Sequence, residues 1–279
     1  MKIKLIALDL DGTTLRSDGT LSNRSRLAIR EAAQKGAIIV PATGRVLVEL
    51  PECLTNLPEI RYVITSNGAC VYDKKENRVL HAEYIPISAV KKVWTLLSHY
   101  NDVLIECYRD GGSFLSRSDL EQLDTFHLTP SVQRFLTNSS KPVENLYEYL
   151  CVLRDPKIEK FNIRAADASI LQELWQKLST LSEIDVTSAG YNCVEINRKG
   201  VNKACGLIAL CEHIAVGSQN VMAIGDGLND KEMLAFSGLP VAMKNAVSEI
   251  IQIGDFVTES NDRDGAALAI EKFVLGLEP

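Results

Sequence analysis

Apolar residues near the two ends of this chain occur in short runs, and each run stops at polar or glycine-rich positions. Residues 5–8, 37–40 and 221–224 form such runs. A short apolar run between turn residues predicts a strand buried on both faces, as in a parallel sheet. Segments with helical spacing lie between the runs, and the segment over 22–35 starts at a good N-cap, Ser22. This order of elements predicts a doubly wound parallel α/β sheet.

The pattern changes between about residues 84 and 190. Strands with one polar face follow each other there, for example over 103–108 and 159–164. Such strands are typical of an α+β domain whose sheet packs on one side only. The length of the chain also suits a main domain with a smaller insertion. We therefore expect a core domain formed by 1–83 and 191–279, and an inserted α+β cap domain at 84–190.

Three predicted strands of the core end in side chains that are suited to catalysis. These are Asp9 and Asp11 after the first strand, Thr43 and Arg45 after the second, and Asp226, Asn229 and Asp230 after the strand at 221–224. Ligands of open α/β sheets bind outside the carboxyl ends of the strands. Buried carboxylates are costly unless a positive charge compensates them, and their hard oxygen atoms suit Mg²⁺. The pattern therefore predicts a magnesium site at this edge of the sheet.

Lys203 adds a cation at the start of the helix predicted over 201–211. A lysine at a helix N-terminus is unfavourable for the helix dipole unless an anion lies nearby. Backbone N–H groups in the turns after the strands are suited to binding phosphate oxygens. Together with a magnesium site, these features indicate chemistry on a phosphorylated compound.

The same residues resemble the haloacid dehalogenase superfamily, whose four motifs occur here in order. They are Asp9-Leu10-Asp11-Gly12-Thr13, Thr43, Lys203, and Gly225-Asp226-Gly227-Leu228-Asn229-Asp230. Three further segments resemble its Cof-type branch, subfamily IIB, which carries a C2 cap between the second and third motifs. They are Ala42-Thr43-Gly44-Arg45, Ser66-Asn67-Gly68-Ala69 and Gly200-Val201-Asn202-Lys203. The resemblance covers the core, and in the cap it rests on length and pattern only.

The resemblance implies a covalent mechanism at the first motif. Asp9 is expected to attack phosphorus and form an aspartyl-phosphate, and Asp11 to act as the acid and then the base. Mg²⁺ is expected to bind the carboxylates of Asp9 and Asp226 and the backbone carbonyl of Asp11. Asp230 is expected to orient the water ligands of the metal, or Lys203, from nearby.

The phosphoryl oxygens need hydrogen-bond donors as well, and the resemblance supplies candidates. They are the N–H groups of Leu10 and Gly44, together with Thr43, Lys203 and Asn229. Arg45 either contacts the substrate or pairs with an acid. Asn67 begins an Asn-Gly pair, which favours a hairpin turn, although its family-like context makes it a possible substrate contact. Asn245 and residues 262–264 are interpreted as helix caps.

These features predict a Mg²⁺-dependent phosphohydrolase that cleaves small phosphorylated metabolites, with sugar phosphates favoured. A sugar phosphomutase or another phosphotransferase would use the same motifs, so it stays as an alternative. A regulator that binds a phosphorylated metabolite without turning it over is a third hypothesis, which the complete set of acids disfavours.

Composition limits the choice of partners and location. A net charge of -6 argues against nucleic acids and anionic membranes as partners, and 18 consecutive apolar residues occur nowhere. The seven cysteines include no Cys-x-x-Cys pair, as is typical of reduced thiols. The first residues run directly into a strand and leave no room for a signal peptide. We expect a cytoplasmic enzyme with no obligate protein partner.

Overall fold

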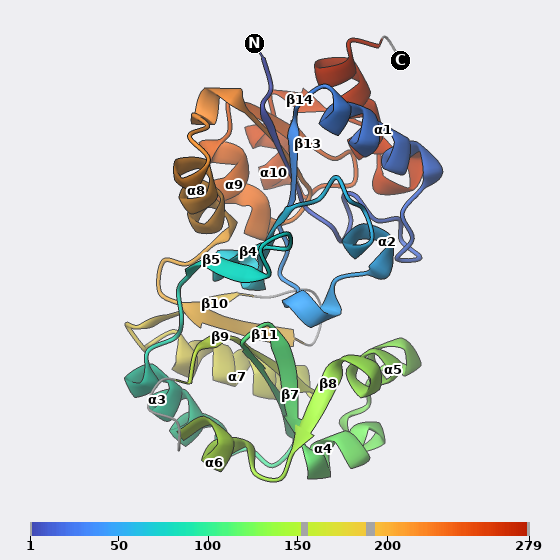
Figure 1. Cartoon of the computed structure of the whole chain (residues 1–279). Coiled ribbons are helices and arrows are strands. Elements are labelled where there is room, and N and C mark those ends of the chain that lie inside the picture. Colours follow the sequence, from blue (N-terminus) through green and yellow to red (C-terminus); the bar gives the residue numbers. More distant parts are fainter. Residues whose placement is uncertain (1, 152–155, 188–192, 278–279) are drawn as a thin grey trace. The chain divides into compact units, whose positions relative to one another are not determined.

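The computed structural model describes residues 2–151, 156–187 and 193–277 (Figure 1). The chain forms two compact units. The first, here called the core unit, comprises Met1–Gly44, Leu50–Ala82 and Asn202–Pro279, and the second, the cap unit, comprises Arg45–Glu49 and Glu83–Val201. None of the helices in the described ranges is long and apolar enough to cross a lipid bilayer.

The core unit is built on a five-stranded parallel sheet with the strand order β14-β13-β12-β1-β2. Its strands are β1 (Leu5–Leu8), β2 (Ile38–Pro41), β12 (Val221–Gly225), β13 (Leu239–Ala242) and β14 (Phe256–Val257). The run at 5–8 is buried throughout, as expected of a strand with neighbours on both sides and helices on both faces. The predicted doubly wound parallel sheet is therefore confirmed.

Helices cover this sheet on both sides (Figure 1). On one side, α8 (Lys203–His213), α9 (Lys231–Phe236) and α10 (Ser248–Ile253) share an apolar cluster with β1 and β12. On the other side, α1 (Asn23–Gln34) packs against β2 and α11 (Gly265–Ile270), which continues as one π-helical turn (Glu271–Leu275). Helix α1 starts where the sequence predicts, because the Ser22 hydroxyl accepts a hydrogen bond from the Ser25 N–H at 2.9 Å.

A second, antiparallel sheet completes the core unit. It contains β3 (Tyr62–Thr65), β4 (Cys70–Asp73) and β5 (Arg78–Ala82), and the short helix α2 (Glu52–Thr55) precedes it. The turn Ser66–Gly68 joins β3 to β4, so the hairpin predicted from Asn67-Gly68 is present. A single parallel bridge between Ala42 and Ile64 places this turn beside the end of β2. Further 3₁₀ turns lie at Ser218–Asn220, Leu228–Asp230 and Asn261–Arg263.

The cap unit is an α+β fold around a six-stranded sheet with the order β10-β11-β9-β6-β7-β8. The strands are β6 (Val103–Arg109), β7 (Gly112–Ser116), β8 (Ser140–Val143), β9 (Ile158–Ala165), β10 (Ile184–Thr187) and β11 (Cys193–Arg198). All neighbouring pairs are antiparallel except β7 and β8. The predicted inserted α+β architecture is therefore confirmed.

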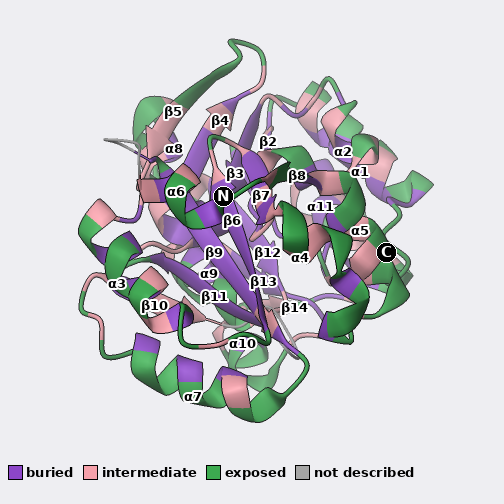
Figure 2. Ribbon diagram, turned by 90° about the horizontal axis from the view of Figure 1, so that it is seen from below, coloured by how far each residue is buried: buried purple, intermediate pink, exposed green. Residues whose placement is uncertain are grey.

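The two faces of the cap sheet differ in chemistry. The apolar face packs against α3 (Ile87–Leu97), α6 (Leu146–Cys151) and α7 (Ala168–Leu178), whose outer surfaces are largely exposed (Figure 2). On the opposite face, Leu104 and Leu115 pack with α4 (Arg117–Glu121), η3 (Leu123–Phe126) and α5 (Pro130–Ser139). The rest of that face is polar, because β6, β9 and β11 alternate apolar and polar residues.

The cap unit differs from the predicted segment 84–190 at its far end and in one added segment. Strand β11 pairs with β9 and β10, so 193–201 belong to the cap unit and not to the core. The predicted end at 190–191 lies outside the described residues. The segment Arg45–Glu49, which contains the 3₁₀ turn η1 (Leu47–Glu49), also joins the cap unit because the Val48 N–H donates to the Gly111 carbonyl at 3.0 Å.

Candidate active site

Asp9 occupies the position directly after β1, an inner strand of the core sheet that lies between β12 and β2. Its N–H donates to the Ile224 carbonyl at 3.0 Å, and its own carbonyl accepts from the Thr14 hydroxyl at 2.6 Å. The residue is only 6% exposed. Parallel pairing with β12 therefore fixes both the backbone and the depth of this carboxylate.

Lys203 connects the first and fourth motifs. Its side chain is fully buried, and Nζ lies 2.5 Å from Asp9 Oδ1 and 2.6 Å from Asp230 Oδ1. The helix start itself is capped by Asn202, whose Oδ1 accepts from the Ala204 and Cys205 N–H groups. Two carboxylates thus compensate a lysine that the helix dipole alone would disfavour, and they raise its pKa.

Asp230 and Asp226 are held in different ways. Asp230 Oδ2 accepts from the N–H groups of Asp226 and Gly227 at 2.9 and 3.0 Å, so both of its oxygens have protein partners. Asp226 Oδ1 accepts from the Thr13 hydroxyl at 2.7 Å. Close packing requires a glycine at position 12, because a Cβ there would lie 2.3 Å from Asp226 Oδ2, and φ is +85°.

The side chains of Asp9, Asp226 and Asp230 converge. One carboxylate oxygen from each lies within 4.8 Å of the others. Burial raises the pKa of Asp9 well above its usual range; the charges of Asp230 and Asp226 add to this, while Lys203 opposes it. Burial also raises the pKa of Asp226. A group of hard oxygen donors with too few positive charges fits a divalent cation, whose charge would favour the ionised carboxylates.

The second motif meets the fourth through Asn67. The Asn67 N–H donates to the Thr43 carbonyl at 3.0 Å, and the Asn67 Oδ1 accepts from Asn229 Nδ2 at 3.4 Å. A Cβ at Gly44 would lie 2.8 Å from that same Oδ1. The hairpin turn therefore also places the Asn67 side chain among Thr43, Gly44 and Asn229, which the sequence alone does not show.

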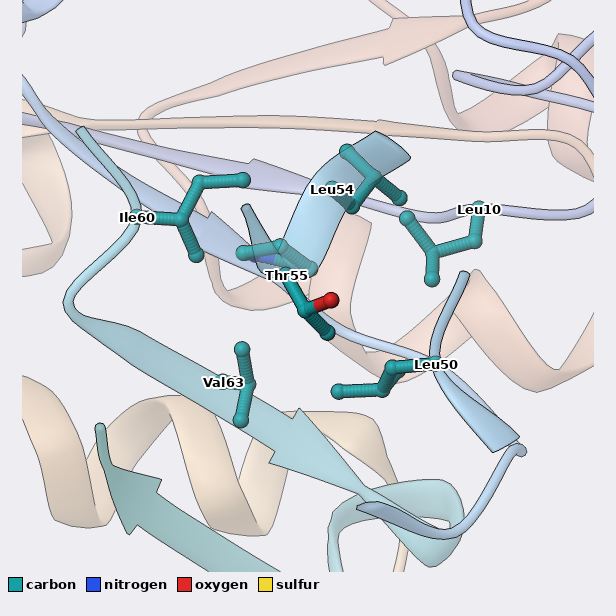
Figure 3. A pocket seen from close by; sticks show the side chains of 7 residues that line it. Leu10, Leu50, Leu54, Thr55, Ile60 and Val63 are labelled. Atoms are coloured by element: carbon teal, nitrogen blue, oxygen red, sulfur yellow. The ribbon is translucent and has the colours of Figure 1, made fainter. Parts of the chain in front are cut away.

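Leu10 directs its side chain away from these polar groups. Figure 3 shows it beside an apolar pocket of the core unit. The lining residues are Leu10, Pro41, Leu50, Leu54, Thr55, Ile60 and Val63. Since the Leu10 side chain packs among apolar groups, its expected contribution to a phosphate site comes from the backbone N–H.

Asp11 and Arg45 are not part of the buried charge cluster. Asp11 is exposed, two residues beyond Asp9. Arg45 belongs to the cap unit, where its Nη1 donates to the Glu49 carbonyl at 3.1 Å. The two alternatives for Arg45, a substrate contact and an ion pair with an acid, both stay predictions.

The sequence interpretation missed several supporting residues. Thr13 and Thr14 bind the carboxylate of Asp226 and the backbone of Asp9, as described above. Asn245 is not a helix cap, since its Nδ2 donates to the Gly12 carbonyl at 2.8 Å and its Oδ1 accepts from the Asn261 N–H at 3.1 Å. Nor does the Asp264 side chain cap α11; it accepts from Arg16 Nη2 at 3.0 Å. These contacts together fix the loop after β1.

Comparison with known proteins identifies this arrangement. The model of the haloacid dehalogenase-like hydrolase family matches residues 6–270. The chain belongs to this family. It is 31% identical to the 5-amino-6-(5-phospho-D-ribitylamino)uracil phosphatase YcsE of Bacillus subtilis (strain 168), over 98% of this chain and 96% of the relative. It is 28% identical to the HMP-PP phosphatase of Cronobacter sakazakii, over 89% of this chain and 86% of that protein.

Solved structures of the family agree with the fold. A haloacid dehalogenase-like hydrolase from Bacteroides thetaiotaomicron has a TM-score of 0.81 at 28% identity, covering 97% of this chain and 99% of the other. A hydrolase of the same kind from B. subtilis has a TM-score of 0.82 at 26% identity, covering 96% and 99%. The resemblance drawn from the four motifs is therefore confirmed, and the chain is an enzyme of the phosphatase type in this family.

Proposed function

We propose that this chain is a Mg²⁺-dependent phosphohydrolase of small phosphorylated metabolites that works through an aspartyl-phosphate. The observation that carries the proposal is the convergence of Asp9, Lys203 and Asp226 at the strand ends of the core unit, from three distant parts of the chain. A buried carboxylate beside a lysine and further acids is suited to nucleophilic attack on a phosphoryl group, because a metal and the lysine together reduce the repulsion between two anions.

Asp9 is the proposed nucleophile and Asp11 the proposed acid and base. An oxygen of Asp9 bonds to phosphorus while the bond between phosphorus and the ester oxygen breaks, and Asp11 gives its proton to that oxygen. A water molecule then attacks phosphorus, its proton passes to Asp11, and the bond between phosphorus and Asp9 breaks. This second step restores both carboxyl groups. The fixed backbone of Asp9 and the exposed position of Asp11 are consistent with these roles.

The proposed metal ligands are the carboxylates of Asp9 and Asp226 and the backbone carbonyl of Asp11. Mg²⁺ bound there would supply positive charge for the phosphoryl oxygens and the nucleophile. Asp230 belongs to the carboxylate cluster, but its oxygens bind Lys203 and two backbone N–H groups. We therefore assign Asp230 the role of holding Lys203 and the Asp226 loop in place.

The phosphoryl oxygens are proposed to bind the N–H groups of Leu10 and Gly44 and the side chains of Thr43, Lys203 and Asn229. The chain from Thr43 through Asn67 to Asn229 supports this set, because it groups the second and fourth motifs. In this proposal Asn67 positions Asn229, and Arg45 stays a possible substrate contact.

Two substrate classes are to be compared first. Sugar phosphates are the class expected from the sequence. The B. subtilis relative is named for 5-amino-6-(5-phospho-D-ribitylamino)uracil, which also carries a phosphorylated polyol chain.

We propose that the reaction takes place in the cytoplasm, which the seven free cysteines support.

The test is a steady-state screen of phosphate esters with the purified chain, with Mg²⁺ and with EDTA. We expect release of inorganic phosphate equal to the substrate consumed, loss of turnover with EDTA, and loss of turnover in Asp9→Asn with retained secondary structure. An isomeric sugar phosphate in place of inorganic phosphate would identify a mutase instead. Full turnover by Asp9→Asn would exclude Asp9 as the nucleophile.

A further inference from the structure

The turn between β3 and β4 has an unusual backbone. Ser66, Asn67 and Gly68 follow one another with positive φ, at +52°, +56° and +94°. All three residues are buried. Non-glycine residues rarely adopt this region, and such strain persists only where the surrounding structure fixes the backbone, as it does at many functional sites. The contacts around the turn therefore indicate what this backbone positions.

The turn and the strand before it hold the backbone of the second motif. The Thr43 N–H donates to the Ile64 carbonyl at 2.9 Å, and the Thr43 carbonyl accepts from the Asn67 N–H at 3.0 Å. Ile64 belongs to β3 and precedes the turn by two residues. Both peptide groups of Thr43 are thus fixed by this one segment, which determines where the Thr43 side chain starts.

The turn also lies against the start of α8. A Cβ at Gly68 would lie 2.0 Å from the Asn202 carbonyl oxygen and 3.0 Å from the Lys203 Cα, whereas ordinary Cβ contacts begin at 3.4 Å. A side chain at Gly68 would therefore need a shift of about 1.4 Å, the difference between 3.4 and 2.0 Å. Lys203 is the first residue of α8, so this close approach sets the point from which its side chain reaches Asp9 and Asp230.

A second glycine permits the same approach from the side of the helix. Gly206 lies three residues further along α8. A Cβ at Gly206 would lie 2.7 Å from Ile64 Cγ2 and 3.2 Å from the Gly68 carbonyl oxygen. The turn and the first residues of α8 are thus in contact through backbone atoms, and the space between them has no room for a further side chain.

The fourth motif meets the turn through the Asn67 side chain, whose Oδ1 accepts from Asn229 Nδ2 at 3.4 Å. The turn therefore contacts the second, third and fourth motifs at once, and all of these contacts lie within the core unit. Thr43, Lys203 and Asn229 are the three side chains that we propose to bind phosphoryl oxygens.

We infer that the turn Ser66–Gly68 is a positioning element of the phosphoryl site, and that Gly68 is a positioning residue that sets the distance of Lys203 from Thr43 and Asn229. Gly68 acts through the backbone of Asn202 and Lys203 and takes no part in the chemical step. The inference rests on the proposed phosphatase activity and deepens it.

The test replaces Gly68 by alanine in the full-length chain with Mg²⁺. A misplacement of about 1 Å costs about a hundredfold in rate, so we expect kcat/KM of Gly68→Ala to fall by about that factor. Gly36→Ala is the matched control for positive φ, because Gly36 follows α1 with a φ of +90° and an added Cβ would have nothing within 4 Å. This control is expected to keep the kcat/KM of the wild type.

Inhibition by orthovanadate separates positioning from a loss of folded protein. Orthovanadate resembles a phosphoryl group during transfer, so it needs the same oxygen-binding side chains. A partly unfolded variant loses kcat, while the inhibition constant of its folded fraction stays that of the wild type. For Gly68→Ala we expect the inhibition constant to rise at least tenfold. The fall in kcat/KM is expected to be equal for a sugar phosphate and for p-nitrophenyl phosphate, because both carry the same phosphoryl group.

Gly206→Ala decides the question if Gly68→Ala does not fold. Alanine favours a helix interior more than glycine does, so α8 stays formed while the added Cβ presses on Ile64 and on the Gly68 carbonyl. The approach to the backbone of the turn is milder here, at 3.2 Å instead of 2.0 Å. We therefore expect a smaller rise of the orthovanadate inhibition constant, by about threefold to tenfold.

Two results would overturn the inference. One is an unchanged orthovanadate inhibition constant in folded Gly68→Ala, or in Gly206→Ala where the first variant does not fold, with folding checked by thermal unfolding. The other is an equal rise in Gly36→Ala, which would assign the effect to positive φ alone. A wild-type chain that releases no phosphate from any ester of the screen contradicts the proposed function itself, and this is visible before any variant is made.

Discussion

Replacing Lys203 by methionine is the most direct perturbation of the candidate site. Methionine has a similar length but no charge, so Asp9 Oδ1 and Asp230 Oδ1 lose a partner at 2.5 and 2.6 Å in a fully buried position. Breaking a buried ion pair by removing one partner costs about 3–5 kcal/mol. Protonating one carboxylate of ordinary pKa at pH 7 costs about 4 kcal/mol, so both estimates agree.

This cost has a defined pH dependence. Lys203 lowers the pKa of Asp9, so its removal raises that pKa further. A carboxyl group with a raised pKa in the folded state contributes stability below its unfolded pKa and loses it as pH rises through the folded value. The Lys203→Met variant is therefore expected to be closest to the wild type near pH 5 and furthest from it near pH 8. Mg²⁺ is expected to restore part of the loss by supplying positive charge.

Thermal unfolding at pH 5 and pH 8, with EDTA and with Mg²⁺, measures these effects. We expect Tm in EDTA at pH 8 to fall by roughly 6–20 °C, from about 2–4 °C per kcal/mol. Lys244→Met is the control, because Lys244 pairs with Glu259 at 3.2 Å on the exposed surface and its removal is expected to change Tm little. A Lys203→Met variant as stable as this control at pH 8 would refute the account of the buried charges.

Three further predictions concern other parts of the chain. Mg²⁺ at 100 times its Kd is expected to stabilise the wild type by about 2.7 kcal/mol, and by more at pH 8 than at pH 6 because the ligands must lose their protons. Calorimetry measures this stabilisation, and an equal stabilisation of the Asp226→Asn variant by Mg²⁺ would contradict the prediction. Burial and the charge of Glu106 raise the pKa of Glu49 from 4.5 to about 7. The stability that the neutral form of Glu49 contributes is complete below pH 4.5 and lost above about pH 7. Between pH 4.5 and pH 8, the free energy of unfolding of Glu49→Gln is therefore expected to rise by up to about 3 kcal/mol relative to that of the wild type, as measured by urea unfolding. Parallel pH curves for the two proteins would exclude this. Gly12→Ala is expected to reduce kcat at least tenfold because its Cβ would lie 2.3 Å from Asp226 Oδ2. Gly19→Ala is the control for backbone strain, because Gly19 has a similar φ of +79° but open space around it. Equal losses of kcat in both variants would contradict the steric explanation.

The parts of the fold that could be predicted are those determined by neighbours in the chain. The apolar run at 5–8 and the Ser22 cap of α1 need only local patterns, and both lie where they were expected. Helix α5 (Pro130–Ser139) is difficult to predict although Thr129 caps it and Pro130 begins it, because its apolar residues alone give a weak signal. The end of the cap unit lies further along the chain than expected, because β11 belongs to the cap unit through its pairing with β9 and β10. The sequence of β11 alone does not show this pairing.

The same division applies to the site. The motif residues Asp9, Lys203 and Asp226 could be named because their types and order carry the signal. Their supports could not, because Asn245 binds Gly12 across 233 positions and Thr13 binds Asp226 across 213. A lone asparagine or threonine has several uses in a loop, and only the folded arrangement selects one of them.

Chain connectivity gives the core motifs a direct relation to the cap unit. The chain enters the cap unit directly after Gly44 for the short segment Arg45–Glu49, and it returns from the second cap segment, Glu83–Val201, to the core unit at Asn202, one residue before Lys203. Two groups proposed to bind the phosphoryl oxygens thus border cap segments in the sequence. A change in length at either point would displace the backbone of a motif residue as well as a linker, so we expect insertions after Gly44 or before Asn202 to impair turnover more than an insertion at the exposed Asp18-Gly19 turn. Comparing kcat of these insertion variants at equal Tm tests that relation, and equal kcat values would argue against it.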